Sequence, residues 1–236
     1  MIITNKHALP APLVRAITFD QQKREGFTVT NLINSPRITQ LQRRRWDEIA
    51  EDASERIWPL LGSAVHYILA KGTTAEALKE ERLEIEVGGV KVRGRPDLWQ
   101  ENIITDYKLT SVWNIVLEPR GRREWHCQLN LYNALYSHAG FPAQKLEVCA
   151  ILRDWQESKR GEHNYPAIQV VMIGIPIWDE ETTMNYLRER VRLHLEAERL
   201  ADDELPLCTP EEMWEKPTTY AAVSYTHLTL PTTPYV

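Results

Sequence analysis

Residues 83–109 read LEIEVGGVKVRGRPDLWQENIITDYKL, and this stretch decides the fold. Side chains alternate between apolar and polar over residues 82–87, which predicts a half-buried strand. The Gly88-Gly89 pair that follows suits the positive backbone angles of a tight hairpin turn. We expect a second strand over residues 90–99 and a third over residues 103–109. Because the hairpin is antiparallel, the sheet cannot be purely parallel.

Three charged residues gather where the second and third strands meet. Gly94 and Pro96 weaken or bend a strand, and Asp97 lies just past that bend. On the third strand, the two-residue period of side chains places Asp106 and Lys108 on the same face. We therefore expect Asp97, Asp106 and Lys108 to share one site.

Two helical patterns flank these strands in the sequence. Apolar residues recur at helical spacing over residues 58–71, and a second pattern covers residues 122–139, with a glycine after each as a stop. Residues four apart on a helix lie one turn apart on the same face. Two such pairs can therefore reach a common site: Gly62 with His66, and Gln128 with Tyr132.

The rest of the chain supplies further strands and helices around this centre. Residues 146–153 and 168–175 read as strands separated by a polar loop, and a charged amphipathic helix follows over residues 179–200. Residues 1–55 are mixed, with a short helix expected over residues 40–51. The order of elements predicts an α/β sandwich with a mixed central β-sheet flanked by helices.

Composition excludes several classes of protein. The chain has 236 residues, of which 43% are hydrophobic and 26% charged, as in an ordinary globular protein. No apolar run is long enough to cross a bilayer, and the N-terminus lacks the layout of a secretory signal, so we expect a cytoplasmic protein. Cys127, Cys149 and Cys208 fit neither a disulfide framework nor a zinc site, and we expect them to be small buried residues.

The charge distribution leaves two interpretations open. The formal net charge of -5 argues mildly against nucleic-acid binding, because phosphate contacts come from Lys and Arg. The negative charge is not evenly distributed, because the sequence also contains two basic groups, Arg43-Arg44-Arg45 and Arg120-Gly121-Arg122-Arg123. They form either a solvated face or a basic cleft on an acidic body. We expect Glu84 and Glu86, which share a strand face, to be solvated.

An acidic residue two positions before a lysine is expected by chance in about every other chain of this length. The spacing of Asp106 and Lys108 alone is therefore weak evidence for a catalytic pair. Four residue pairs that occur in one order are stronger evidence. They lie in the segments GSAVH at residues 62–66, GRPD at 94–97, DYK at 106–108 and QLNLY at 128–132. Together these segments resemble the motif series of the RecB-like branch of the PD-(D/E)XK nuclease superfamily, a branch that includes phage exonucleases and CRISPR-associated exonucleases. The resemblance spans residues 58–175.

The resemblance implies a restriction-endonuclease-like core and a role for each motif residue. It implies that Asp97 and Asp106 bind a divalent metal, Mg²⁺ or Mn²⁺, with His66 as a further ligand and the main-chain carbonyl after Asp106 completing the set. It implies that Lys108 is the catalytic lysine, and that Gln128 and Tyr132 orient the site and contact DNA. Some RecB-like members hold an iron-sulfur cluster on four cysteines. The three cysteines of this chain lie at unrelated positions, so we expect no cluster.

Phosphodiester chemistry agrees with these residue types. Hydrolysis places negative charge on the phosphoryl and leaving oxygens, so the site needs cations, and two carboxylates can hold Mg²⁺ there. The imidazole of His66 tilts the preference slightly toward Mn²⁺. Lys108 can position a water, stabilise developing charge or act as a base, and the sequence leaves these roles open. Taken singly, each motif residue has an ordinary structural explanation, such as a turn cap for Asp97 or core packing for Tyr132.

We therefore expect a divalent-metal-dependent DNA nuclease, an exonuclease that acts on DNA ends in phage or bacterial recombination or repair. The alternative is a catalytically inactive DNA-binding module on a nuclease fold. DNA is the expected partner, together with a recombination or single-strand annealing protein, and oligomers are compatible with the sequence. If the gene belongs to a phage, the protein acts in the cytosol of the bacterial host. No GxxxxGK[ST] loop is present, so the chain is not itself a motor ATPase.

The expected domain organisation follows from the extent of the resemblance. We expect a single nuclease domain over residues 1–223, made of an N-terminal arm, residues 1–55, a catalytic core, residues 56–200, and the start of a truncated C-terminal part, residues 201–223. Residues 224–236 show neither periodicity nor helix caps and resemble translated vector or adaptor sequence. We interpret them as a non-native tail, with a disordered natural tail as the alternative.

Overall fold

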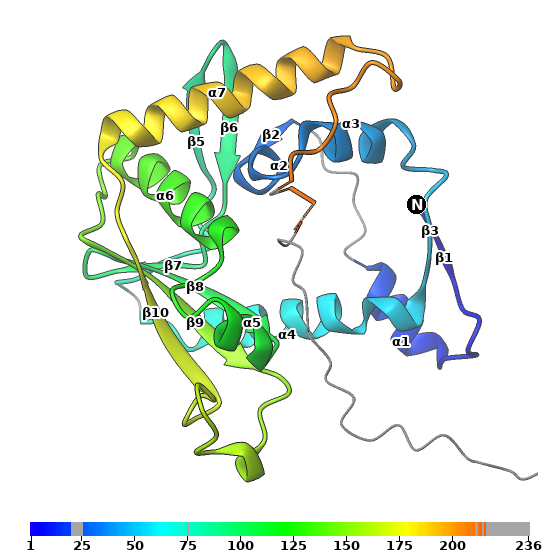
Figure 1. Ribbon diagram of the computed structural model, residues 1–236, viewed down its shortest axis with the longest axis vertical. Helices are drawn as coiled ribbons and strands as arrows, with labels where there is room; N and C mark the ends of the chain where they lie inside the picture. The colour runs from blue at the N-terminus through cyan, green and yellow to red at the C-terminus, as the bar shows by residue number, and fades with distance from the viewer. Residues whose placement is uncertain (20–25, 75, 211, 214, 216–236) are drawn as a thin grey trace, which may run out of the picture.

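The computed structural model describes residues 1–19, 26–74, 76–210, 212–213 and 215 (Figure 1). The tail expected over residues 224–236 lies outside the described residues. The elements form a mixed α/β fold, and no helix in the described part of the chain is long and apolar enough to cross a membrane.

A mixed sheet of five strands lies at the centre of the molecule, in the order β10-β9-β8-β7-β4 (Figure 1). Of its pairs, β8 and β9 run parallel, and the other three are antiparallel. The sheet is therefore mixed, as the sequence predicts. The strands are β4 (Leu78–Lys79), β7 (Leu98–Gln100), β8 (Ile103–Thr110), β9 (Lys145–Leu152) and β10 (Val170–Ile175).

Helices cover both faces of this sheet. Helix α6 (Arg123–His138) packs on β8, β9 and β10, and helix α4 (Ile57–Lys71) packs on β8. The His66 ring of α4 lies edge-on to Tyr107 with the ring centroids 6.4 Å apart. Tyr107 points to the opposite face from its neighbours Asp106 and Lys108, because side chains alternate along a strand. The short helix α5 (Val112–Leu117) follows β8 directly.

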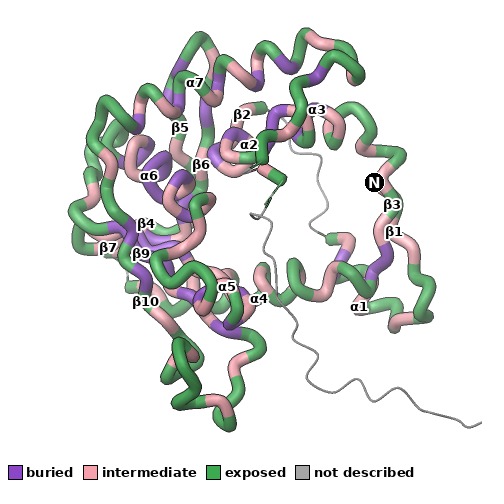
Figure 2. Tube along the Cα trace, viewed as in Figure 1, coloured by how far each residue is buried: buried purple, intermediate pink, exposed green. Residues whose placement is uncertain are grey.

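A second layer packs on the other side of α6. It contains the hairpin of β5 (Leu83–Val87) and β6 (Val90–Gly94), the strand β2 (Phe27–Thr28), and helices α2 (Val29–Ile33) and α7 (Glu180–Arg199). Leu129 and Tyr136 of α6 belong to the core cluster against the central sheet, whereas Leu131 and Leu135 belong to the cluster against β6 and α7. Helix α6 is thus buried on both sides (Figure 2). Its polar residues Gln128 and Asn130 sit between two apolar layers.

The expected second strand, residues 90–99, is wrong as a single element. It breaks into β6 and β7, and these belong to different sheets. The break falls at Arg95-Pro96-Asp97, where Pro96 has no N–H for a strand ladder. The chain therefore leaves the small sheet at Gly94 and enters the central sheet at Leu98, with Asp97 at the crossing.

The short helix expected over residues 40–51 is also misplaced. Helix α3 (Pro36–Arg44) begins earlier, because Pro36 occupies the first helical turn, where its missing N–H costs nothing. Residues 50–52 instead form strand β3 (Ala50–Asp52), which pairs in parallel with β1 (Ile2–Thr4). The remaining elements are α1 (Ala11–Thr18) and the 3₁₀ turns η1 (Ala53–Arg56) and η2 (Glu157–Lys159).

The arginines of α3 do not line a basic cleft. Arg43 pairs with Glu198 at 2.9 Å, and Arg44 and Arg45 pair with Asp202 at 2.9 and 2.8 Å. Glu198 and Asp202 lie at and beyond the end of α7. Arg44 and Arg45 are exposed, so this basic group agrees with a solvated face whose arginines form ion pairs with the α7 end.

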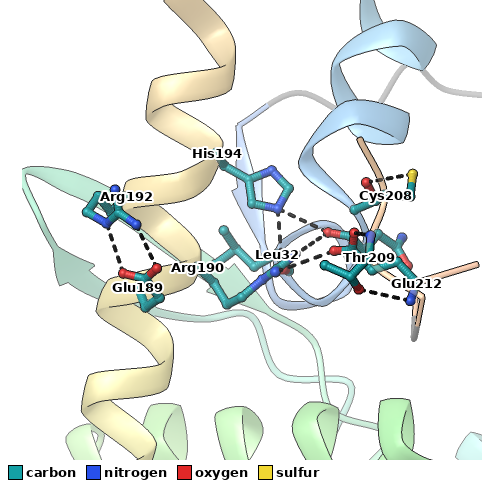
Figure 3. A network of polar contacts seen from close by, with 10 residues as sticks. Leu32, Glu189, Arg190, Arg192, His194, Cys208, Thr209 and Glu212 are labelled. Carbon is teal, nitrogen blue, oxygen red and sulfur yellow. Dashed lines mark hydrogen bonds and ion pairs between the residues drawn. The ribbon is translucent and has the colours of Figure 1, made fainter. Parts of the chain in front are cut away.

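The segment after α7 folds back against α2 and α3 (Figure 3). Arg190 of α7 donates a hydrogen bond to the Leu32 carbonyl at 2.6 Å, and its guanidinium lies 3.6 Å from Glu212. The buried ring of His194 contacts the carbonyls of Leu32 and Asn34 at 3.3 and 3.2 Å. Burial lowers the pKa of His194 to about 4, so the ring is neutral at pH 7.

The cysteines are free thiols. Cys127 is buried, as expected, whereas Cys149 and Cys208 are partly exposed. Cys208 Sγ lies 3.3 Å from Ser35 Oγ at the start of α3. Glu84 and Glu86 are exposed on the hairpin, in agreement with the strand pattern.

Candidate active site

Asp97 and His66 form the first part of the site. Asp97 Oδ1 lies 3.1 Å from His66 Nδ1, and Asp97 Oδ2 accepts a hydrogen bond from the main-chain N–H of Tyr107 at 2.8 Å. The hydrogen bond to Asp97 holds the pKa of His66 above its ordinary value, against the opposing effect of burial. The bend at Pro96 thus brings Asp97 between helix α4 and strand β8.

Asp106 and Lys108 form the second part, and their side chains lie on the face of β8 opposite to Tyr107. Lys108 Nζ lies 2.6 Å from Asp106 Oδ2, and the Asp106 side chain is only 3% exposed. Burial raises the pKa of Asp106 above its ordinary value, and the charge of Asp97 acts in the same direction. Burial lowers the pKa of Lys108, but the Asp106 carboxylate outweighs it and holds that pKa above its ordinary value. Lys108 is therefore an ammonium ion in this arrangement.

Helix α6 completes the site from the side of its polar face. Lys108 Nζ donates a hydrogen bond to Gln128 Oε1 at 3.0 Å, and Gln128 Nε2 donates to the hydroxyl of Tyr132 at 3.0 Å. Tyr132 is buried, and burial raises the pKa of its hydroxyl. The spacing of one helical turn between Gln128 and Tyr132 is what allows one amide to link the lysine to the phenol.

The structure therefore brings together all six residues singled out in the sequence. His66, Asp97, Asp106, Lys108, Gln128 and Tyr132 are joined in one chain of contacts. The link between its two parts is the Tyr107 N–H, which holds Asp97 and lies between Asp106 and Lys108 on β8. The two glycines that accompany them behave differently.

Packing explains why position 94 is a glycine, but it does not explain the glycine at position 62. A Cβ atom on Gly94 would lie 3.0 Å from Tyr132 Cε1, closer than such atoms normally approach. Gly94 thus allows the Tyr132 ring to pack against the end of β6. Nothing lies within 4 Å of the corresponding position on Gly62, so packing does not explain that residue.

The donor types at the site fit a hard divalent cation. Asp97 and Asp106 offer carboxylate oxygens, and His66 offers an imidazole nitrogen, the groups that bind Mg²⁺ and Mn²⁺. The negative charge of Asp97 helps to raise the pKa of Asp106, as expected for two nearby carboxylates. In the described part of the chain, no three His, Cys, Asp or Glu side chains converge into a ready-made metal cluster. Instead, Lys108 and His66 each cover one carboxylate oxygen.

A cavity of about 330 Å³ opens beside Asp97 and His66. Arg95 and Glu80 border it, and their side chains lie 3.3 Å apart. The sequence contains Arg95 within the GRPD segment but offers no signal for its place. Glu80 comes from a turn about fifteen positions earlier, and only the folded chain places both residues at the cavity. The remaining lining residues are Ser63, His66, Tyr67 and Asp97.

Comparison with known proteins finds similarity in structure. No protein-family model and no curated protein matches the sequence. The crystal structure of SSO0001 matches with 22% identity and a TM-score of 0.51, over 77% of this chain and 84% of that one. This likeness shows a shared fold.

Two exonuclease structures match at lower TM-scores. The alkaline exonuclease LHK-Exo from Laribacter hongkongensis matches with 13% identity and a TM-score of 0.42, over 74% of this chain and 92% of that one. The phage-related exonuclease from Haemophilus somnus 129PT matches with 15% identity and a TM-score of 0.34, over 79% of each chain.

Proposed function

We propose that this chain is a divalent-metal-dependent DNA nuclease that hydrolyses phosphodiester bonds. The observation that carries the proposal is the buried Asp106–Lys108 pair, joined through the Tyr107 N–H to Asp97 and through Gln128 to Tyr132. A buried carboxylate beside a partly buried ammonium is costly to maintain for stability alone, and strongly perturbed groups gather at functional sites. The assignment to the RecB-like branch of the PD-(D/E)XK nucleases is part of this proposal and rests on the four motif pairs.

Asp97, Asp106 and His66 would hold Mg²⁺ or Mn²⁺. When bound, such a cation supplies positive charge to the phosphate and makes water more acidic. The Tyr107 N–H fixes the orientation of Asp97, and the strand geometry of β8 fixes Asp106 relative to it. The positions of both carboxylates are therefore set by main-chain structure.

Lys108 would stabilise charge on the scissile phosphate. An ammonium group has three N–H donors, and the contacts with Asp106 and Gln128 leave one for a phosphate oxygen. Without a metal, the Asp106 carboxylate holds the pKa of Lys108 above its ordinary value, which favours the ammonium form for this role. Gln128 and Tyr132 hold the ammonium in place and would lie beside the DNA.

We further propose that the enzyme is an exonuclease acting on DNA ends in phage or bacterial recombination or repair. In this proposal residues 1–223 form one nuclease domain, and a recombination or annealing protein is its partner. The expectation that the enzyme requires a DNA end comes from the resemblance of the motifs to those of phage exonucleases.

The test compares end-labelled linear duplex DNA with covalently closed circles of the same sequence, in Mg²⁺ or Mn²⁺ and in a chelator, with an RNA duplex as a third substrate. We expect degradation of linear DNA, sparing of circles and no reaction in the chelator. Cutting of circles at the same rate would remove the end dependence. A folded preparation that binds DNA but leaves every substrate intact, and whose binding survives Asp106→Ala, would replace the proposal with an inactive DNA-binding module.

A further inference from the structure

Two exposed tryptophans lie beside the proposed site. Trp58, in the first turn of α4, is 49% exposed, and Trp113, in the first turn of α5, is 53% exposed. Helix α4 is rich in apolar residues, yet none of them is buried (Figure 2). Large aromatic side chains normally contribute their area to a core or an interface. These two rings are therefore candidates for contact with a ligand.

Each ring has a cation near it. The Arg153 guanidinium lies 4.2 Å from the centre of the Trp58 ring, and Lys159 Nζ lies 6.0 Å from the centre of the Trp113 ring. Arg153 is exposed, and its charge helps to lower the pKa of the neighbouring Asp154 carboxyl. The adjacent carboxylate of Asp154 accepts hydrogen bonds from Ser111 Oγ at 2.6 Å and from the Val112 N–H at 2.7 Å.

These rings and cations belong to the same end of the sheet as Lys108. The Arg153 N–H donates to the Thr110 carbonyl at 3.0 Å, and Thr110 follows Lys108 on β8 by two residues. Two residues of a strand span roughly 7 Å. Trp113 comes directly after this strand end, across the Ser111 cap of α5. The main chain that carries Trp113 and holds Arg153 therefore lies within a few residues of Lys108 at this end of the sheet.

We propose that Trp58 and Trp113, with Arg153 and Lys159, form a stacking site for the bases of single-stranded nucleic acid next to the catalytic site. The proposal rests on the proposed nuclease function and names the form of substrate that the enzyme holds. Exposed rings beside cations suit bases and phosphates together, as in proteins that bind single strands without sequence preference. A single strand presents bases to the rings and phosphates to the cations along one chain, whereas two copies of a chain with net charge -5 repel each other.

The test measures binding of a fluorescein-labelled oligothymidylate of twenty nucleotides by anisotropy, in a chelator so that no cleavage occurs. We expect Trp58→Leu and Trp113→Leu each to weaken binding by about tenfold. The phenylalanine variants at the same positions keep a ring and should retain most of the affinity. Phe19→Leu removes a 90% exposed ring elsewhere and should change nothing. Thermal unfolding of every variant verifies the fold.

Salt dependence separates the cations from the rings. Arg153→Gln and Lys159→Gln should each reduce the slope of affinity against salt by about one counterion, whereas the tryptophan variants should leave the slope unchanged. Unchanged affinity in the Trp58→Leu, Trp113→Leu double variant overturns the stacking site. So does loss of self-association in that variant with unchanged DNA binding, which would assign the surface to a second copy of the chain.

The outcome is distinguishable from failure of the proposed function. Weakened oligonucleotide binding in a protein that cleaves nothing would leave the stacking site standing and remove the nuclease. If the wild type degrades linear DNA and the double variant binds the oligonucleotide normally, the nuclease function stands and the stacking site is overturned.

Discussion

Two buried polar networks of this molecule differ in where their contacts end. At the candidate active site, the contacts run from side chain to side chain, from Asp106 through Lys108 and Gln128 to Tyr132. On α7, Arg190 and His194 instead end on the carbonyls of Leu32 and Asn34 (Figure 3). The α7 network ties three segments together and satisfies main-chain acceptors. The site network ends on side chains, and the cavity of about 330 Å³ lies beside the adjoining residues Asp97 and His66.

The difference shows that a buried charge is not by itself a sign of function. Buried polar groups in both networks carry shifted pKa values. What separates them is the surroundings: Arg190 and His194 also satisfy the main-chain carbonyls of Leu32 and Asn34, whereas the Asp106–Lys108 pair adjoins Asp97, which borders a cavity. We therefore expect substitutions in the first network to change activity and those in the second to change stability.

The largest expected effect is at Lys108. Lys108→Ala should reduce DNA cleavage by at least about 10²-fold, because it removes a preorganised cation from the phosphate site. The fold should persist, since the buried Asp106 carboxyl, with its already raised pKa, can take up a proton. Single-turnover cleavage and circular dichroism measure both. Lys91→Ala, an exposed lysine on β6, is the matched control, and equal activity of the two variants would place the chemistry elsewhere.

The α7 network should respond in stability. Arg190→Met should lower the free energy of unfolding by about 3 kcal/mol, because it leaves the partly buried Glu212 carboxylate without its cation and removes a hydrogen bond to the Leu32 carbonyl. Arg192→Met is the matched control on the same helix, where exposed pairs with Glu189 and Glu196 contribute little. Urea unfolding measures both, and cleavage per folded molecule should be unchanged. Loss of cleavage in folded Arg190→Met would join the two networks into one.

His194 should make stability fall in acid. Its pKa is about 4 in the folded chain and about 6.5 when unfolded, so the unfolded state takes up a proton that the folded state does not. Stability should therefore decrease as the pH falls from about 6.5 to 4, by up to about 3 kcal/mol. The difference between wild type and His194→Gln across this range isolates the ring from other groups, including His66. Parallel stability curves for the two proteins would contradict the buried neutral ring.

The smallest expected effect is at Gly94. Gly94→Ala should push the Tyr132 ring away by a few tenths of an ångström and reduce cleavage about tenfold with little loss of stability. Gly174→Ala, on β10 with open space around it, is the control and should cleave normally. Cleavage kinetics of both variants measure this. Equal rates would show that the position of Tyr132 does not matter for the reaction.

The local pattern of the sequence predicted the elements that carry the site. The helix over 58–71, the strand over 103–109 and the helix over 122–139 agree with α4, β8 and α6 to within a residue or so at each end. Periodicity and stop signals depend only on residues close together in the sequence, so these helices and strands can be predicted from the sequence alone. The six site residues were brought together by the motif resemblance, and the structure places them in one chain of contacts.

What the sequence could not predict depends on distant pairing. Gly94 and Pro96 indicate a bend in the strand, but they do not show that the chain changes sheet there, because that depends on which strands β6 and β7 pair with. The charge run at Arg43 hides its partners, because Glu198 lies 155 positions away. The Trp58 contact with Arg153 and the parallel pairing of β1 with β3 likewise join segments far apart in the chain. Such pairs become visible only after folding.

The most direct test of the central claim is a calorimetric titration of Mn²⁺ into the wild type and three variants, with cleavage of linear DNA measured on the same preparations. We predict that the wild type binds the metal and cleaves, and that Asp97→Ala and Asp106→Ala lose both properties. Lys108→Ala should bind the metal and fail to cleave. Equal metal binding by all four proteins, or cleavage that survives Asp106→Ala, would contradict the assignment of these residues as the metal site of a nuclease.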